Sequence, residues 1–252
     1  MEMHISPATK HRAELAKIMA AADSFQPERG IIAGGALTSA FTGREINDID
    51  IYFGCVGDFQ LAVQDAYDEG WWCVSATDRA VTFIRGPRVI QLMCFGFFAS
   101  PAEVFDAFDF TACMGAYDIE GQQFVFHEDF LKHAAQRHLS FHNGTRYPFA
   151  SLLRVLKYQS RGYTVGKGDL LRIALCCHRI PLETWDDLAK AIGGQYGEKV
   201  NLDESQPFSI EAALQLLSSS ELMIPAQSEE MPGSAEELLQ KIGMPFEELA
   251  VA

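Results

Sequence analysis

Two aspartates separated by one residue, Asp48 and Asp50, have the type and spacing expected of ligands for divalent cations. Residues 47–53 alternate polar and apolar side chains, which predicts a half-buried strand. Residues two apart on a strand project from one face, so both carboxylates would reach the same ions while Ile49 and Ile51 face the core. Carboxylate oxygens suit Mg²⁺, and two such ions about 3.5 to 4 Å apart promote phosphoryl transfer to a hydroxyl. The pair therefore indicates a two-metal site.

A double glycine, Gly34-Gly35, stands upstream between a short apolar run and a helical pattern. This order predicts a strand, a turn and a helix, and residues without Cβ let backbone N–H groups approach phosphates at a helix N-terminus. Thr38 and Ser39 follow in the helix and could add hydroxyl donors. A tight turn that needs glycine only for its backbone conformation would look the same, so the aspartates decide in favour of phosphate binding.

The elements that must position these residues form an α+β pattern. Helices are expected at residues 11–22, 36–41 and 58–69, and strands at 30–33, 47–53, 71–75, 79–85, 88–95, 111–117 and 122–126. Beyond about residue 143 helical patterns dominate, at 149–161, 170–178 and 182–192. In the helix expected at 149–161, Leu152, Leu153, Val155 and Leu156 are available for burial. We therefore expect a head of residues 1–143 with a mixed sheet and flanking helices, then a helical neck and small acidic helical region over 144–252.

Composition bounds the class of protein. The chain has 252 residues, 48% of them hydrophobic, and a net charge of −14, which argues against a protein that coats nucleic acid with its whole surface. Only residues 127–180 are basic, with 9 Lys and Arg against 3 Asp and Glu. Six scattered cysteines without C-x-x-C spacing predict reduced thiols. No apolar run reaches the roughly 18 residues of a membrane span, so no membrane partner and a cytoplasmic location are expected.

Four segments resemble one family. Residues 34–51, GGALTSAFTGREINDIDI, resemble the GGxVRDxLLGRxxxDxDx signature of the polymerase-β-like nucleotidyltransferase superfamily, in the form carried by bacterial CCA-adding enzymes and poly(A) polymerases. Residues 108–118 (FDFTACMGAYD) and 128–132 (EDFLK) are similar to that group's RRDFTINAMAYD and G-x-EDLK segments. Residues 152–164 are similar to its LRILRAARFAARLGFT helix. The resemblance covers roughly residues 30–165 and implies the head fold, two Mg²⁺ ions and an NTP substrate, with ATP as the donor.

The departures from this pattern fall where the family handles nucleotides. Gln91 stands where the family has a third carboxylate, so Asp109 is a candidate to assist the metals instead. Thr38-Ser39 replaces the Arg-Asp that follows the double glycine. Residues 147–151, YPFAS, replace the EDxxR motif that reads the incoming base, so templated selection of C and then A is not expected.

Cations of the expected neck helix are candidates for contact with the triphosphate or with an RNA acceptor. They are Arg146, Arg154, Lys157 and Arg161, interleaved with tyrosines that could stack on bases. The same residues would also form the solvated face of an ordinary helix.

The expected activity is Mg²⁺-dependent transfer of a nucleoside monophosphate from an NTP to an acceptor hydroxyl, such as an RNA 3′ end of tRNA. Asp48 and Asp50 would bind the metal ions, and Gly34, Gly35 and Ser39 would cradle phosphates. One alternative is an acceptor on a protein side chain or small molecule, which the acidic charge favours. Another is a non-catalytic nucleotide-binding or interaction protein on the same scaffold. The sequence does not indicate an oligomeric state.

Overall fold

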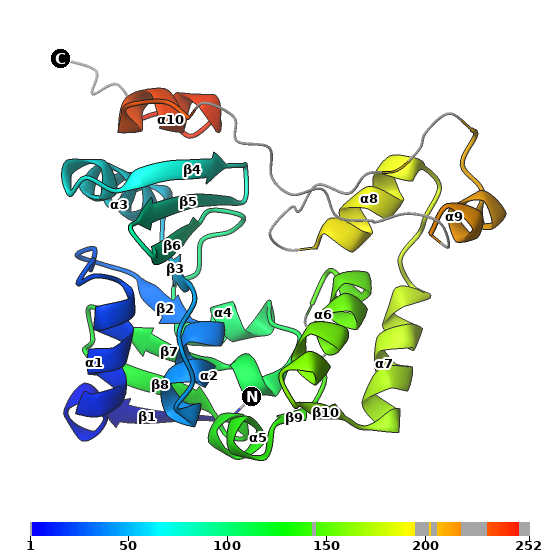
Figure 1. Ribbon diagram of the computed structural model, residues 1–252, viewed down its shortest axis with the longest axis horizontal. Helices are drawn as coiled ribbons and strands as arrows, with labels where there is room; N and C mark the ends of the chain where they lie inside the picture. Colours follow the sequence, from blue (N-terminus) through cyan, green and yellow to red (C-terminus); the bar gives the residue numbers. More distant parts are fainter. Residues whose placement is uncertain (1, 143–144, 195–201, 203–205, 218–230, 247–252) are drawn as a thin grey trace.

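The computed structural model describes residues 2–142, 145–194, 202, 206–217 and 231–246, and its central feature is an eight-stranded mixed sheet (Figure 1). The strand order is β1-β8-β7-β2-β3-β6-β5-β4, in which β3 and β6 are parallel and the other neighbours antiparallel. The strands are β1 (Met3–Pro7), β2 (Ile31–Ala33), β3 (Ile49–Tyr52), β4 (Trp72–Ala76), β5 (Ala80–Arg85), β6 (Arg88–Met93), β7 (Gly115–Asp118) and β8 (Gln123–His127). The expected α+β fold is confirmed.

Helices flank the sheet and then continue into the neck, at the right of Figure 1. Those among the first 142 residues are η1 (Ala8–Lys10), α1 (Arg12–Ala21), α2 (Gly35–Thr42), α3 (Val56–Asp68), α4 (Pro101–Asp106), η2 (Thr111–Cys113) and α5 (Phe130–Gln136). Those that follow are α6 (Pro148–Ser160), α7 (Lys167–Cys177), α8 (Trp185–Gly193), α9 (Ile210–Leu217) and α10 (Ala235–Lys241). A two-stranded parallel pair, β9 (His138–Leu139) and β10 (Thr164–Val165), links the end of the head to the neck.

The sheet separates two hydrophobic clusters because alternate residues of each strand face opposite sides. Ile32 and Ile51 are opposite one another in the β2–β3 ladder and pack with α1, α2 and α3. Ala33 and Tyr52 face the other side, in a cluster that also takes in residues of α4, η2, α6 and α7. The neck is therefore packed on the face of the sheet to which Asp50 belongs.

Two parts of the head differ from the sequence-based expectation. Residues 3–7 form the edge strand β1, paired with β8, although no strand was expected before residue 30. The strand expected at residues 111–117 begins instead as the 3₁₀ helix η2, because the backbone N–H of Thr111 bonds the Ser140 carbonyl and its hydroxyl bonds His133 Nδ1 at 2.7 Å. Only β7 remains of that strand.

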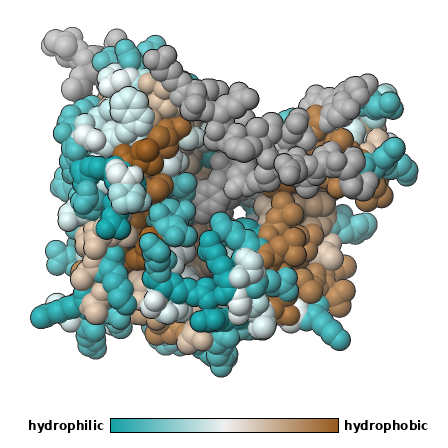
Figure 2. Space-filling model, in the orientation of Figure 1, coloured by the Kyte–Doolittle hydropathy of each residue, from teal (hydrophilic) through white to brown (hydrophobic). Residues whose placement is uncertain are grey.

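Helix α6 packs on the head with a different side from the leucine-containing side expected from the sequence. Its buried side is formed by Ser151, Val155 and Tyr158, whereas Leu156 is 62% exposed and Leu153 is also exposed. The polar Ser151 can be buried because its hydroxyl bonds the Tyr147 carbonyl. Figure 2 shows the resulting hydrophobic surface over α6 and α7. The expectation that Leu153 and Leu156 are buried was wrong.

Helix α10 returns to the head. Leu238 and Leu239 belong to the cluster on the α3 side of the sheet, and Gln60 Nε2 of α3 donates to the carbonyls of Met244 and Pro245. The division expected at residue 143 falls on a residue outside those described. Within the region expected to form the neck and C-terminal part, α10 is thus packed on the head and not on the neck.

Two expectations from composition concern the thiols and membranes. All six cysteines are free, and Cys73, Cys94 and Cys113 are buried. Across the described part of the chain, every helix is too short or too polar to cross a bilayer.

Candidate nucleotide and metal site

Asp50 lies at the centre of the sheet, on β3, with 9% of its surface exposed. Its parallel register partner on β6 is Gln91, and its antiparallel partner on β2 is Ala33. Asp48 lies one residue before the first residue of β3 and is exposed. The strand is thus shorter than the sequence suggested, and Asp48 lies just outside it.

Gly34 brings the start of α2 against Asp50. It precedes β3 in sequence and caps α2 with φ 87° and ψ −135°, a conformation essentially restricted to glycine. A Cβ on Gly34 would lie 3.7 Å from Asp50 Oδ2, so the backbone and the carboxylate are neighbours. The first N–H groups of a helix point outward without intrahelical partners and attract anions. The structure therefore places the N-terminus of α2 beside a carboxylate.

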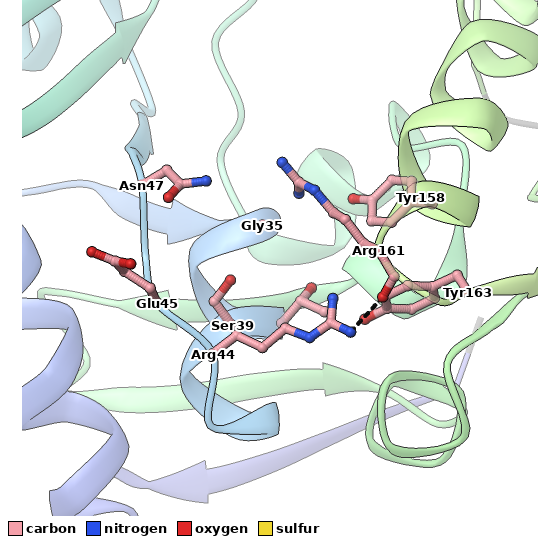
Figure 3. A pocket seen from close by; sticks show the side chains of 9 residues that line it. Gly35, Ser39, Arg44, Glu45, Asn47, Tyr158, Arg161 and Tyr163 are labelled. Carbon is pink, nitrogen blue, oxygen red and sulfur yellow. Dashed lines mark hydrogen bonds between the residues drawn. The ribbon is translucent and has the colours of Figure 1, made fainter.

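A polar cavity of about 180 Å³ opens between α2 and the end of α6 (Figure 3). It is lined by Gly35, Thr38, Ser39, Arg44, Glu45, Asn47, Tyr158, Arg161 and Tyr163. Arg44 Nη2 donates to the Arg161 carbonyl at 2.6 Å, and its guanidinium lies 5.3 Å from the centre of the Tyr163 ring. Figure 3 shows the Arg161 side chain reaching toward Gly35. The head and neck thus share one cationic cavity.

The two hydroxyls expected to serve phosphate differ in their availability. Thr38 is buried, and its hydroxyl bonds the Ala112 carbonyl at 2.8 Å and the Gly34 carbonyl at 3.2 Å. Those bonds fix the start of α2 to the segment before β7 and occupy the Thr38 hydroxyl. Ser39 is half-buried at the cavity wall and is the hydroxyl that the cavity presents.

Asp109 pairs with the neck. Its side chain is 3% exposed, and its Oδ1 lies 3.3 Å from Arg154 Nη1. Beside this pair, Cys113 Sγ and the Tyr158 hydroxyl are 2.8 Å apart, and burial raises the pKa of both groups. Asp109 as an aid to the metals stays a prediction, and in this structure its carboxylate pairs with Arg154.

Of the remaining residues that the sequence suggested for nucleotide or acceptor contact, some line the cavity and others do not. Gln91 sits beside Asp50 in the register, and its Nε2 lies 3.5 Å from Thr82 Oγ1. Lys157 is exposed and faces away from the buried side of α6, and Arg146 is exposed just before that helix. Of the four neck cations, Arg161 alone lines the cavity. Sequence reasoning assigned no role to Arg44, Glu45 or Asn47, although the Gly43-Arg44 pair was part of the recognised signature.

Asp48, Asp50 and Gln91 are the side chains that could hold the Mg²⁺ that the resemblance implies. Among the residues described, no group of three His, Cys, Asp or Glu side chains could hold a metal by itself. Asp48 and Asp50 do fit an ion that arrives with a nucleotide, because Mg²⁺ keeps several waters and needs only one or two carboxylates plus phosphate oxygens. Beside Asp50, Gln91 would offer a neutral amide oxygen at the position where the resembled family has a third carboxylate.

Comparison with known proteins relates the chain to one family. The family model described as Gabija anti-defense 2 family protein matches residues 8–137. The protein "Gabija anti-defense 2" of Bacillus phage SPbetaL7 is 40% identical over 182 residues, which make up 72% of this chain and 45% of that protein. The chain thus spans less than half the length of this curated relative.

Solved structures share the fold. A CCA-adding enzyme with ATP superposes with a TM-score of 0.55 at 13% identity, over 76% of this chain and 51% of that chain. The Thermotoga maritima CCA-adding enzyme complexed with tRNA gives a TM-score of 0.52 at 11% identity, over 86% and 55% of the two chains. At such identities the likeness concerns the fold alone, and it confirms the expected nucleotidyltransferase-like head.

Proposed function

Because the chain belongs to the Gabija anti-defense 2 family and has the head fold of nucleotidyltransferases, we propose that it transfers a nucleoside monophosphate from an NTP to an acceptor hydroxyl. The donor we propose is ATP bound with Mg²⁺. We propose further that this transfer underlies the anti-defence role for which the family is named. The acceptor that the resemblance suggests is an RNA 3′ end such as that of tRNA, and its class is taken up in the next subsection.

One observation supports the proposal above others: the Asp50 carboxylate lies against the capping residue of α2. Asp50 Oδ2 is 3.7 Å from the position that a Gly34 Cβ would take, so a phosphate held by the helix N-terminus would lie beside that carboxylate. An NTP that brings its own Mg²⁺ needs this combination of backbone N–H groups and acidic ligands.

Each part of the site has a role in the proposed step. The backbone N–H groups at Gly34 and Gly35 and the Ser39 hydroxyl bind the β- and γ-phosphates, while the Arg161 guanidinium neutralises their charge. Asp48 and Asp50 hold Mg²⁺, which when bound neutralises the phosphates and activates the acceptor hydroxyl. The Asp50 carboxylate, at the centre of the sheet, fixes the position at which the α-phosphate meets the acceptor.

Labelled nucleotide tests this proposal directly. The chain is incubated with Mg²⁺ and each NTP labelled at the α-phosphate, and pyrophosphate release is measured with tRNA, with proteins or with no acceptor. We expect release with the wild type and at least a hundredfold less with Asp50→Asn, because one of two metal-binding carboxylates is lost. Glu236→Gln, an exposed carboxylate on α10, is the matched control. Absence of pyrophosphate under every condition would refute the activity.

A cellular assay separates catalysis from binding. In cells that carry the Gabija defence, expression of the wild-type chain is expected to relieve the defence, whereas Asp50→Asn is not. If Asp50→Asn relieves the defence as well as the wild type does, the chain acts as a non-catalytic interaction protein on a nucleotidyltransferase scaffold.

A further inference from the structure

The surroundings of Asp50 differ on its two sides. Toward α2 and α6 lies the cavity that contains the Arg44 and Arg161 guanidinium groups. Toward β6, β5 and β4 the same face of the sheet continues for three more strands. If the cationic side holds the triphosphate, as proposed above, the other side is where the acceptor hydroxyl must lie. The side chains on that face of the sheet therefore indicate which chemical class of acceptor binds there.

The register of the strands shows which side chains share this face. Asp50 pairs with Gln91, Gln91 with Thr82, and Thr82 with Ser75, which forms one polar row across four strands. A β-bulge between Cys73 and Ser75 brings the serine into this row, since the hydroxyl would otherwise point to the opposite side. Apart from Asp50, the row consists of neutral hydroxyl and amide groups, all of them half-buried.

A second, apolar row lies beside the polar one. Trp72 pairs with Ile84, and Ile84 with Val89, one pleat further along the same face. Ile84 and Val89 are half-buried, whereas Trp72, on the edge strand β4, is 70% exposed. A large, exposed tryptophan beside neutral polar groups is typical of an anchor for a protein segment, because tryptophan is enriched among the residues that dominate interface energies.

This face carries no cation on the four strands. The side chains that β3, β6, β5 and β4 turn to it are Asp50, Tyr52, Val89, Gln91, Met93, Ala80, Thr82, Ile84, Trp72 and Ser75. Arg79, in the turn between β4 and β5, is engaged elsewhere, with the Gly194 carbonyl and the Tyr147 ring. Phosphate contacts from Lys and Arg supply most of the affinity of proteins for nucleic acids. A nucleic acid lying on these four strands would find no Lys or Arg among their side chains for such contacts, and the cations on this side of the sheet belong to the neck and to the turn at Arg79.

We propose that the acceptor is a polypeptide, with the hydroxyl of a Ser, Thr or Tyr side chain as the attacking group. This inference rests on the proposed nucleotidyl transfer. The neutral row offers hydrogen-bonding partners to an extended peptide backbone, and Trp72 packs against an apolar side chain of the segment. The hydroxyl oxygen bonds the α-phosphorus, the bond from that phosphorus to the α,β-bridging oxygen breaks, and pyrophosphate leaves with the electron pair. The hydroxyl proton is released to water.

Transfer of label from α-labelled ATP distinguishes the acceptors. The full chain is incubated with Mg²⁺ and ATP in the presence of a pooled peptide library containing Ser, Thr or Tyr, or of tRNA. We expect label on peptides that survives ribonuclease and is lost on proteolysis. Label on tRNA alone, or only on small molecules, would overturn the polypeptide acceptor while leaving nucleotidyl transfer intact. No pyrophosphate with any acceptor would overturn the transfer proposal itself.

A variant of the sheet face gives a second measurement. Trp72→Ala is expected to raise the peptide concentration for half-maximal labelling roughly tenfold, because an interface anchor is lost. Binding of ATP, measured by titration calorimetry, is expected to stay unchanged, which also shows that the variant is folded. Leu61→Ala, at a 56% exposed position on α3 behind the sheet, is the matched control. Equal peptide dependence for both variants would contradict the role of Trp72 and of this face.

Discussion

Replacement of Arg154 by methionine is expected to destabilise the fold by more than the loss of a surface ion pair. Arg154 Nη1 lies 3.3 Å from Asp109 Oδ1, and the Asp109 side chain is 3% exposed. Methionine keeps most of the aliphatic volume but leaves a buried carboxylate without its cation. Breaking a buried pair in this way costs about 3 to 5 kcal/mol. Because the Arg154 side chain is 30% exposed and partly screened by water, we expect roughly 2 to 4 kcal/mol.

Thermal unfolding of the full chain measures this cost. At about 2 to 4 °C per kcal/mol for a chain of this size, Arg154→Met should lower Tm by roughly 5 to 15 °C. The double variant Asp109→Asn with Arg154→Met removes both charges and should recover at least half of the loss. Lys190→Met breaks the exposed pair with Asp186 and serves as the control, with Tm expected within about 2 °C of wild type.

Two results would refute this reasoning. A change in Tm for Arg154→Met no larger than that for Lys190→Met would show that Asp109 is not dependent on its partner. A double variant less stable than Arg154→Met would show that the packing of the side chains, and not the unpaired charge, sets the cost.

Three other predictions concern the site and its support. Gly34→Ala places a residue with Cβ at φ 87° and ψ −135°, so urea titration should show that the free energy of unfolding falls by about 1 to 3 kcal/mol. Leu61→Ala, at an exposed position, is the control, and a smaller decrease for Gly34→Ala than for this control would contradict the prediction. Gln91→Glu adds a carboxylate beside Asp50 and should lower the Mg²⁺ concentration for half-maximal NTP binding several-fold. An unchanged Mg²⁺ concentration would show that the metal lies elsewhere. Burial lowers the pKa of His133 below its ordinary value of 6.5, so the unfolded chain takes up a proton before the folded chain does. The free energy of unfolding should therefore fall as the pH drops below 6.5, and His133→Gln should flatten that dependence in titrations between about pH 5 and pH 7.

The local parts of the site could be predicted from the sequence because they depend on short-range patterns. The period-2 alternation around Asp50 and the double glycine at Gly34-Gly35 identified β3 and the start of α2. Gln91 was assigned to the position of the family's third carboxylate from the resemblance, and the register places it beside Asp50.

Other features depend on contacts between distant segments, which local patterns do not encode. The Asp109–Arg154 pair and the bond from Arg44 to the Arg161 carbonyl join the head to the neck. The leucines of α6 suggested burial of Leu153 and Leu156, whereas the helix buries Val155 and Tyr158, whose hydroxyl lies 2.8 Å from Cys113 Sγ. The polar row on the sheet needed the strand order, and the alignment of Ser75 needed the bulge.

The return of α10 to the head has a consequence for how the protein is made. Leu238 and Leu239 fill part of the cluster around α3, and Tyr67 bonds the Pro232 carbonyl, yet these partners are synthesised well after the sheet. While the ribosome is still translating α7 to α9, the nascent sheet therefore presents an uncovered apolar surface. The folding of the sheet can finish only after α10 has emerged from the exit tunnel, and chaperones have time to act on the exposed surface until then.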